Sequence, residues 1–105
     1  MNSITVQQLK AWRDEGVDHQ LIDIREPYEY DVSHIGGEHI PMGDIKSRID
    51  NIRTDVPVVI HCRSGSRSAA VTHALTEQLG FDNVHNLEGG IRAWAEHLDP
   101  NMDVA

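Results

Sequence analysis

Residues 56–70 read VPVVIHCRSGSRSAA, and this stretch predicts a strand, a tight polar loop and a helix in direct succession. Its β-branched run at 58–60 is typical of a buried strand in a parallel sheet. A single cysteine follows, and after it come only arginine, serine and glycine. Apolar residues then recur at helical spacing over 68–79, and Gly80 supplies a stop signal. A strand that runs through a short loop into a helix is the unit around which we expect the fold to be built.

The predicted loop has the features of an anion-binding site around a thiol. Backbone N–H groups of the loop and of the first helical turn lack helical partners and point to one spot, where the helix dipole adds positive potential. The residues expected to supply these groups are Ser64, Gly65, Ser66 and Ser68. Arg63 and Arg67 add two fixed charges. Cys62 stands at the mouth of this site, so we expect its pKa to lie below the usual value of about 8.5.

Simpler interpretations of these residues are also open. An isolated cysteine is more often a small buried hydrophobic residue than a nucleophile. Cys62, however, is followed by two arginines, three serines and a glycine, which favours the reactive role. The serines either contact a bound anion or serve only the turn, and Ser68 is also a candidate N-cap of the helix.

Three stretches of the chain resemble the signatures of rhodanese domains, a family of sulfurtransferases. HCRSGSRS at 61–68 resembles the active-site loop, LIDIREPYEY at 21–30 the first structural signature, and NLEGGIRAW at 86–94 the second. The resemblance implies that the strand before the cysteine is central and neighbours the strand of the first signature. Cys62 and Arg25 would then meet at one end of the sheet.

Strand and helix patterns alternate along the remaining sequence. This alternation is typical of a three-layer α/β/α domain with a five-stranded, mainly parallel sheet, and residues 1–105 are expected to form one such rhodanese-like domain. Besides the central unit, we expect strands at 4–5, 19–24 and 38–40, a turn and a last strand within 81–87, and helices at 6–16, from 27, at 44–52 and from 88 to Asp99. Thr5 is the expected N-cap of the first helix. Residues 101–105 are expected to pack loosely.

Polar residues near the predicted carboxyl edge of the sheet allow more than one role. Asp23 is expected to form a buried ion pair or a hydrogen-bonded corner. Arg25 either shares that corner or faces the active loop, where it would bind an anionic substrate. His34 and His39 either line the mouth of the site or serve packing.

The composition argues against several classes of protein. The net charge of −8 disfavours a nucleic-acid partner, and no apolar run is long enough to span a membrane. The first residues lack an export-signal pattern and the single cysteine suits a reducing compartment, so the expected location is the cytoplasm. The seven histidines lack metal-ligand spacing, and we expect no metal and no cofactor.

The resemblance implies sulfur transfer through a persulfide on Cys62. Arg63, Arg67 and Arg25 would orient a small anionic donor such as thiosulfate, and cyanide, a thiol or a protein would accept the sulfur. The variant SHIGGEHIP at 33–41 resembles rhodanese domains appended to enzymes that adenylylate ubiquitin-like sulfur carriers. Such a carrier is therefore one expected protein acceptor.

Two other functions remain open. A cysteine phosphatase or arsenate reductase of this fold has five residues between its cysteine and arginine, whereas four separate Cys62 from Arg67. The second alternative is an interaction module that carries a persulfide without catalysis. Some rhodanese-like scaffolds have lost the cysteine, and its retention here favours an enzyme.

Overall fold

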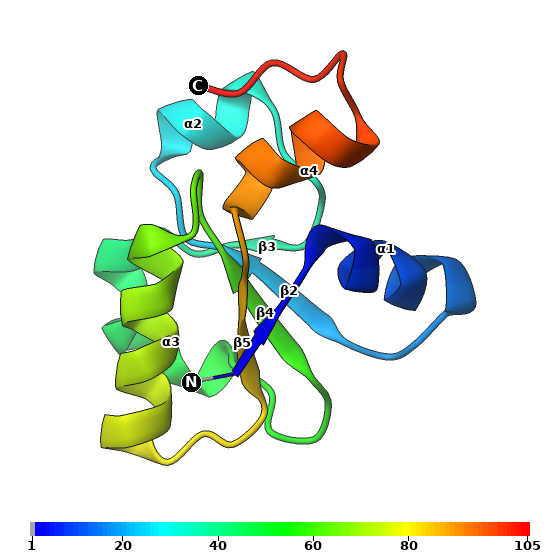
Figure 1. Cartoon of the computed structure of the whole chain (residues 1–105). Helices are drawn as coiled ribbons and strands as arrows, with labels where there is room; N and C mark the ends of the chain where they lie inside the picture. Colours follow the sequence, from blue (N-terminus) through cyan, green and yellow to red (C-terminus); the bar gives the residue numbers. More distant parts are fainter. Residues whose placement is uncertain (1) are drawn as a thin grey trace.

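The computed structural model describes residues 2–105, which form a parallel sheet between two helical layers (Figure 1). The strands are β1 (Asn2–Ile4), β2 (Gln20–Asp23), β3 (Glu38–His39), β4 (Val58–His61) and β5 (Val84–Leu87), in the order β1-β5-β4-β2-β3. The α-helices are α1 (Val6–Glu15), α2 (Pro27–Val32), α3 (Ser66–Leu79) and α4 (Gly90–Leu98). Two 3-10 segments, η1 (Met42–Asp44) and η2 (Lys46–Asn51), precede β4. The predicted three-layer α/β/α fold with a five-stranded sheet is confirmed.

Strand β4 lies in the middle of the sheet, as predicted, between β2 and β5. All four of its side chains are buried, which suits β-branched residues covered on both faces. Asp23 of β2 is in register with His61 of β4, and Ile24 N donates to His61 O at 3.1 Å. This register brings the residues that follow both strands, Arg25 and Cys62 among them, to the same edge of the sheet.

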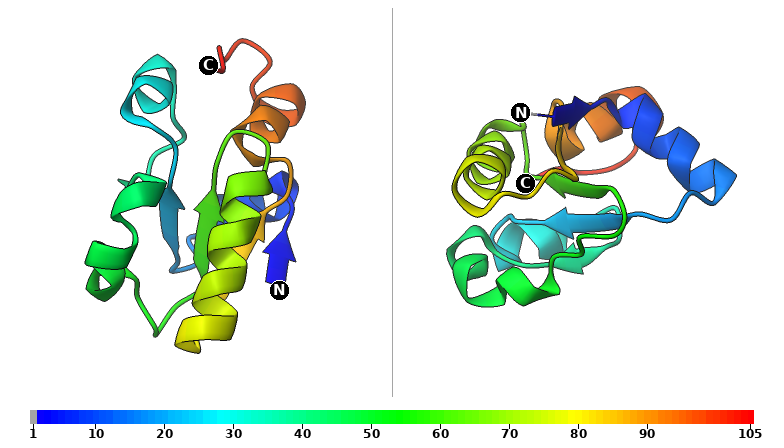
Figure 2. Two further views of the ribbon diagram at one scale, coloured as in Figure 1. Left: turned by 90° about the vertical axis from the view of Figure 1, so that its left-hand side faces the viewer. Right: turned by 90° about the horizontal axis from the view of Figure 1, so that it is seen from below.

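The sheet lies between two helical layers (Figure 2), and it separates two apolar clusters. Val58 and Ile60 of β4 belong to the cluster under α3 and the 3-10 segments, whereas Val59 belongs to the cluster under α1 and α4. Alternate side chains of a strand point to opposite faces, so a single strand contributes to both cores. The helices thereby hold β4 from both sides and fix the point where it ends.

The ends of α1 follow the sequence signals. Thr5 is the N-cap: its Oγ1 accepts from Gln8 N at 3.2 Å, and Gln8 Oε1 accepts from Thr5 N at 2.8 Å. Gly16 ends the helix in the left-handed conformation at φ 70°. The cap predicted at Thr5 and the stop predicted near Gly16 are both confirmed.

The helix predicted for 44–52 is wrong in kind. The segment consists of η1 and η2, and its backbone departs from helical angles at Arg48 (φ −122°, ψ 26°). Ser47 Oγ donates to Asp44 O at 2.9 Å and so competes with a helical hydrogen bond. Ile45 and Ile52 are nonetheless buried, because the apolar spacing that suggested a helix also satisfies these tighter turns.

The loose packing predicted for 101–105 is also wrong. Met102 and Val104 pack against the cluster under α1 and α4. Ser33 donates its hydroxyl to Asp103 O, and Arg63 Nε donates to Ala105 O. Alternating apolar residues hold this short segment across the carboxyl edge of the sheet, a pattern too short to recognise in the sequence.

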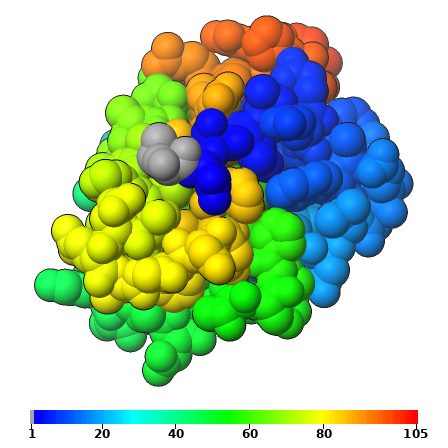
Figure 3. Space-filling view, turned by 60° about the horizontal axis from the view of Figure 1, so that its bottom comes forward, coloured from blue at the N-terminus to red at the C-terminus, as the bar shows by residue number. Residues whose placement is uncertain are grey.

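At one side of the sheet, the first strand in the sequence pairs with the last one. Residues of β1 lie beside those of β5 (Figure 3). Ser3 is in register with Asn86. The first strand is thus completed by the last one. No helix within residues 2–105 has the length and apolarity that crossing a membrane requires.

Candidate active site

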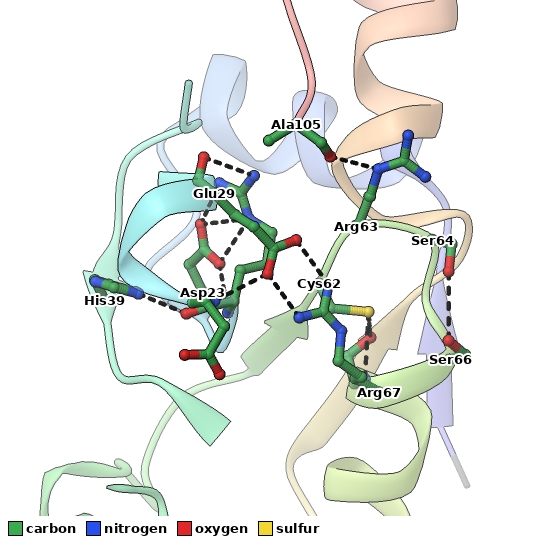
Figure 4. A network of polar contacts seen from close by, with 12 residues as sticks. Asp23, Glu29, His39, Cys62, Arg63, Ser64, Ser66, Arg67 and Ala105 are labelled. Carbon is green, nitrogen blue, oxygen red and sulfur yellow. Dashed lines mark hydrogen bonds and ion pairs between the residues drawn. The ribbon is translucent and has the colours of Figure 1, made fainter. Parts of the chain in front are cut away.

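The sulfur of Cys62 lies directly beyond β4, inside a ring of hydrogen-bond donors (Figure 4). Gly65 N donates to Sγ at 3.1 Å and Ser68 N at 3.4 Å. The Ser68 hydroxyl lies 3.3 Å from the same sulfur. Cys62 and Ser68 are both fully buried, so these contacts take the place of water around the sulfur.

Helix α3 begins earlier than the sequence suggested. It starts at Ser66, and Gly65 at φ 100° is its N-cap, so the start predicted at Ser68 and the capping role for that serine are wrong. The left-handed glycine turns the chain into the helix at once. Ser68 therefore falls within the first turn, where its hydroxyl points at Cys62 and not at the helix end. The first helical residues are polar, and apolar periodicity could not reveal them.

The pKa of the Cys62 thiol is lowered, in the predicted direction. Burial by itself raises this pKa, but the Ser68 hydroxyl and the backbone N–H groups of Ser68, Gly65 and Ser64 outweigh burial. A thiolate is stabilised because each of these donors can point at it. The main contributors are thus neutral hydrogen bonds: the backbone donors that the sequence analysis expected, together with the Ser68 hydroxyl.

Helix α4 keeps the N–H groups of the loop turned inward. Its first amides bind the outward-facing carbonyls: Ile91 N donates to Cys62 O at 2.9 Å and Arg92 N to Arg63 O at 3.0 Å. Gly90 makes this approach possible, since a Cβ there would lie 2.4 Å from Cys62 O. The second signature, NLEGGIRAW, is therefore the support of the loop carrying Cys62.

Arg67 is paired with a residue that sequence reasoning did not single out. Its guanidinium donates to the two carboxylate oxygens of Glu29 on α2, at 2.8 and 2.9 Å. Hydrogen bonds from Arg67 lower the pKa of Glu29 even though burial opposes this, and Glu29 raises the pKa of Arg67. The Arg67 side chain remains 35% exposed, so one face of it is open to solvent.

Arg25 is fully buried at the end of β2, in the ion pair foreseen for Asp23. Its guanidinium donates to Asp23 at 2.7 Å and to Ser33 O at 2.8 Å. Burial raises the pKa of Asp23, but the hydrogen bonds from Arg25 outweigh burial, so the net shift of this pKa is downward. His61 Nε2 lies 3.7 Å from Asp23, and burial lowers the pKa of His61 to about 4. Contact of Arg25 with a substrate stays a prediction.

The other loop residues face outward. The hydroxyls of Ser64 and Ser66 lie 3.4 Å apart on the surface, and Arg63 Nε meets Ala105 O (Figure 4). His34 and His39 stack on either side of the Tyr30 ring, at centroid distances of 4.2 and 4.4 Å. His39 Nε2 also donates to Arg25 O at 2.7 Å. Both histidines thus pack against Tyr30 of α2.

Two buried polar residues complete the site, Glu29 and Asn86. Asn86 Oδ1 accepts a hydrogen bond of 2.5 Å from Ser68 Oγ. Each lies at a strand or helix position where an apolar residue would normally pack. A polar residue at such a position was the feature of the sequence that could have identified them as site residues. Among residues 2–105, no three His, Cys, Asp or Glu side chains are grouped as metal ligands.

An apolar groove of about 530 Å³ lies along α3, away from the sulfur. The 3-10 segments form its other wall, and none of residues 62–68 lines it. The chemistry of the loop is therefore separate from this hollow.

Several known proteins are similar to this chain in sequence and in fold. The model of the Rhodanese-like domain matches residues 5–97. A sulfurtransferase of Allochromatium vinosum is 40% identical over 98 residues, covering 92% of this chain and 91% of that protein. The probable adenylyltransferase/sulfurtransferase MoeZ of Mycobacterium tuberculosis is 38% identical over 104 residues; these are 96% of this chain but only 26% of MoeZ. A rhodanese-like domain protein of Staphylococcus aureus superimposes with a TM-score of 0.83 at 32% identity, covering 100% of this chain and 99% of that one. The chain belongs to the rhodanese-like domain family.

Proposed function

We propose that this protein is a sulfurtransferase that carries sulfane sulfur as a persulfide on Cys62. The observation that carries the proposal is the buried Sγ that faces the N–H groups of Gly65 and Ser68 and the Ser68 hydroxyl. Such donors stabilise a thiolate before attack and a departing thiolate after it. The relative in A. vinosum, which this chain matches over nearly its whole length, is itself a sulfurtransferase.

The proposed reaction has two steps. The Cys62 thiolate attacks the outer sulfur of a donor such as thiosulfate; an S–S bond forms to Cys62, and sulfite leaves with the electron pair of the broken bond. A thiophile such as cyanide or a thiolate then attacks the outer sulfur of the persulfide, and Cys62 leaves as a thiolate. The enzyme returns to its starting state. Each step transfers one sulfur atom, and neither step needs an external oxidant or reductant.

The arginines would divide the binding of the donor between them. The Arg67 side chain is partly exposed and its charge is partly balanced by Glu29, so it can orient an anion without holding it tightly. Arg63, at the outer side of the loop, can attract the donor if its contact with Ala105 O is exchanged for one with the anion. Arg25 would act mainly by holding Asp23 and the end of β2 in place.

A protein is one proposed acceptor. MoeZ, by its name, combines a probable adenylyltransferase with a sulfurtransferase, and this chain corresponds to about a quarter of it. The SHIGGEHIP variant points in the same direction. We therefore propose an adenylylated, ubiquitin-like sulfur carrier as acceptor and the cytoplasm as the place of the reaction. Persulfidated protein that passes sulfur to small thiols but to none of a panel of adenylylated carriers would contradict this.

The deciding experiment compares sulfur with phosphate chemistry. The protein is incubated with thiosulfate or with an aryl phosphate, and intact mass is measured without reductant. We expect a gain of one sulfur atom, reversed by cyanide with release of thiocyanate, and no phosphate release. Cys62-dependent phosphatase activity without persulfide formation would overturn the proposal, and a persulfide that no acceptor can discharge would favour the interaction module.

A further inference from the structure

The hydroxyl of Ser68 lies between two buried groups and has a single proton for both. Its Oγ is 3.3 Å from Cys62 Sγ and 2.5 Å from Asn86 Oδ1. A hydroxyl donates one hydrogen bond, so it cannot donate to the sulfur and to the amide oxygen together. While Ser68 donates to Asn86, it offers Cys62 only a lone pair, which suits a thiol and opposes a thiolate.

We propose that Asn86 is a positioning residue that decides whether Ser68 accepts from the Cys62 thiol or donates to its thiolate. With the thiol, S–H donates to Ser68 Oγ, and Oγ–H donates to Asn86 Oδ1. With the thiolate, the Asn86 amide turns over, Nδ2 donates to Oγ, and Oγ–H donates to Sγ. An asparagine amide carries a donor on one side and an acceptor on the other, so a half-turn reverses the whole chain of hydrogen bonds.

The fold holds these three groups on rigid elements. Asn86 on β5 is in register with Ile60 on β4, two residues before Cys62, and Ser68 lies in the first turn of α3. Within residues 2–105, Ser68 is the only hydrogen-bond partner of the Asn86 side chain, so turning the amide breaks no other contact. Asn86 is 7% exposed and Ser68 is fully buried.

The charged groups around the sulfur have partners of their own. These pairs are Arg67 with Glu29, Arg25 with Asp23, and Arg63 with the carbonyl of Ala105. His61, the residue before Cys62, is kept neutral by burial, which lowers its pKa to about 4. The neutral pair of Ser68 and Asn86 is therefore the part of the surroundings that can reorient when the sulfur gains its charge.

For the proposed sulfur transfer, this reversal matters most when the persulfide is discharged. Cys62 then leaves as a thiolate, and a leaving thiol departs faster when its pKa is lower. Ser68 donation to Sγ at that moment assists departure. The ionisation of Cys62 itself does not depend on the donor or acceptor of sulfur, so it can be tested without assuming the reaction.

The test measures the alkylation rate of Cys62 by iodoacetamide against pH in four variants and the wild type: Asn86→Asp, Asn86→Leu, Ser68→Ala, and Asn86→Asp with Ser68→Ala. An aspartate only accepts and keeps the Ser68 proton, so in Asn86→Asp the pH midpoint of alkylation should lie about one unit higher, and the rate should be about tenfold lower at pH values below both midpoints. A leucine accepts nothing and leaves the proton to the sulfur, so Asn86→Leu should stay within about threefold of the wild type.

The double variant separates hydrogen bonding from charge. If Asn86 acts through Ser68, the Asn86→Asp substitution should slow alkylation far less once Ser68 is replaced by alanine. An equal slowing in both backgrounds would mean that charge alone acts, and an Asn86→Leu protein as slow as Asn86→Asp would mean that the role is structural. Either result overturns the proposal.

A measurement on the wild type guards against misfolded variants. The side-chain amide signals of Asn86 in ¹H–¹⁵N NMR spectra should shift with the same midpoint as the alkylation of Cys62. In Ser68→Ala this shift should be lost. Amide signals that stay constant across the titration of the wild-type thiol would overturn the proposal, whatever the sulfur-transfer activity of the protein.

Discussion

At the scale of single residues, two opposing effects act on the proton of Cys62. Removal of the sulfur from water favours the neutral thiol, whereas the hydrogen bonds of Ser68, Gly65 and Ser64 favour the thiolate, and the hydrogen bonds prevail. Short hydrogen bonds thus favour the nucleophilic thiolate form of Cys62. Long-range attraction by the arginines is the smaller part, because Glu29 already occupies Arg67.

Replacement of the nucleophile should remove the chemistry and leave the fold. Cys62→Ser exchanges one small atom, so the unfolding midpoint in urea should change little. Thiosulfate:cyanide sulfur transfer should fall to the background rate, because an alcohol forms no persulfide. Glu77→Gln, an exposed change on α3, should keep wild-type activity. A folded Cys62→Ser protein that still transfers sulfur would show that the reaction takes place elsewhere.

At the scale of elements, the loop depends on the helix that follows β5. The N-terminus of α4 binds the carbonyls of Cys62 and Arg63, which holds the start of the loop while the N–H groups of Ser64, Gly65 and Ser68 face the sulfur. The length of the loop matters for the same reason. Four residues separate Cys62 from Arg67, and we expect this short loop to leave a ring that fits one added sulfur atom.

Substitution of Gly90 tests the contact between α4 and the loop. Gly90→Ala combines a left-handed residue at φ 57° with a Cβ 2.4 Å from Cys62 O. The expected loss is about 2–5 kcal/mol of unfolding free energy, together with slower alkylation of Cys62. Gly80→Ala is the matched control: φ is 75° and nothing lies within 4 Å, so about 1–2 kcal/mol is expected with unchanged alkylation. Equal losses in the two variants would mean that the close approach is not needed.

Lengthening the loop should exchange sulfur for oxyanion chemistry. One glycine inserted between Gly65 and Ser66 moves the Ser68 donors away from Sγ and widens the ring. Sulfur transfer should fall by about a hundredfold, and tungstate or arsenate should now protect Cys62 from alkylation. An insertion between Asp18 and His19, remote from the loop, should do neither. Unchanged sulfur transfer in the longer loop would contradict the importance of the donor ring.

At the scale of the whole molecule, the carboxyl edge of the sheet is tied together by charge. Glu29 on α2 and Arg67 on α3 lie 38 residues apart in sequence and join elements from different parts of the fold. Beside them, Arg25 and Asp23 hold the end of β2. These pairs hold the elements that surround Cys62, and their strength should follow the charge of the carboxylates.

The Glu29–Arg67 pair should therefore make stability depend on pH. The pKa of Glu29 is lowered in the folded protein, so its stabilisation is complete above the unfolded pKa of about 4.3 and is lost as the pH falls through the folded value. Glu29→Gln should reduce the unfolding free energy by about 1–3 kcal/mol at pH 7, measured with urea. At pH 3 the two proteins should be closer in stability. Glu96→Gln, on the exposed side of α4, should match the wild type, and a pH-independent gap for Glu29→Gln would refute the ion pair.

Local signals in the sequence were sufficient for most of the fold. The β-branched run of β4, the cap at Thr5 and the left-handed glycines at 16 and 80 all act within a few residues, and each was predicted. The 3-10 segments were mistaken for a helix because Ile45 and Ile52 satisfy both spacings. Met102 and Val104 were missed because their packing depends on where α1 and α4 lie.

The candidate site shows the same difference between local and distant contacts. Cys62 and its loop were recognisable because strand, loop and helix are contiguous in sequence. Glu29 and Asn86 were not, because their partners lie 38 and 18 residues away and neither residue belongs to a turn, a cap or an apolar period. The loop N–H groups expected to lower the pKa of Cys62 do so, whereas the partners of Arg63 and Arg67 could not be read from the sequence.

The pairing of β1 with β5 has a consequence for how the protein is made. The ribosome synthesises β1 before the other four strands, yet the strand that pairs with it spans Val84–Leu87, so β1 stays unpaired in the nascent chain until these residues have emerged. Contacts between residues so far apart in sequence slow folding more than they lower the stability of the folded protein. The entropic cost of closing the loop grows only with the logarithm of its length. Residues 84–87 also carry Asn86, the partner of Ser68. A chain stalled before this strand therefore lacks both the support of β1 and one wall of the thiol site, and cysteine reactivity should develop only late in translation.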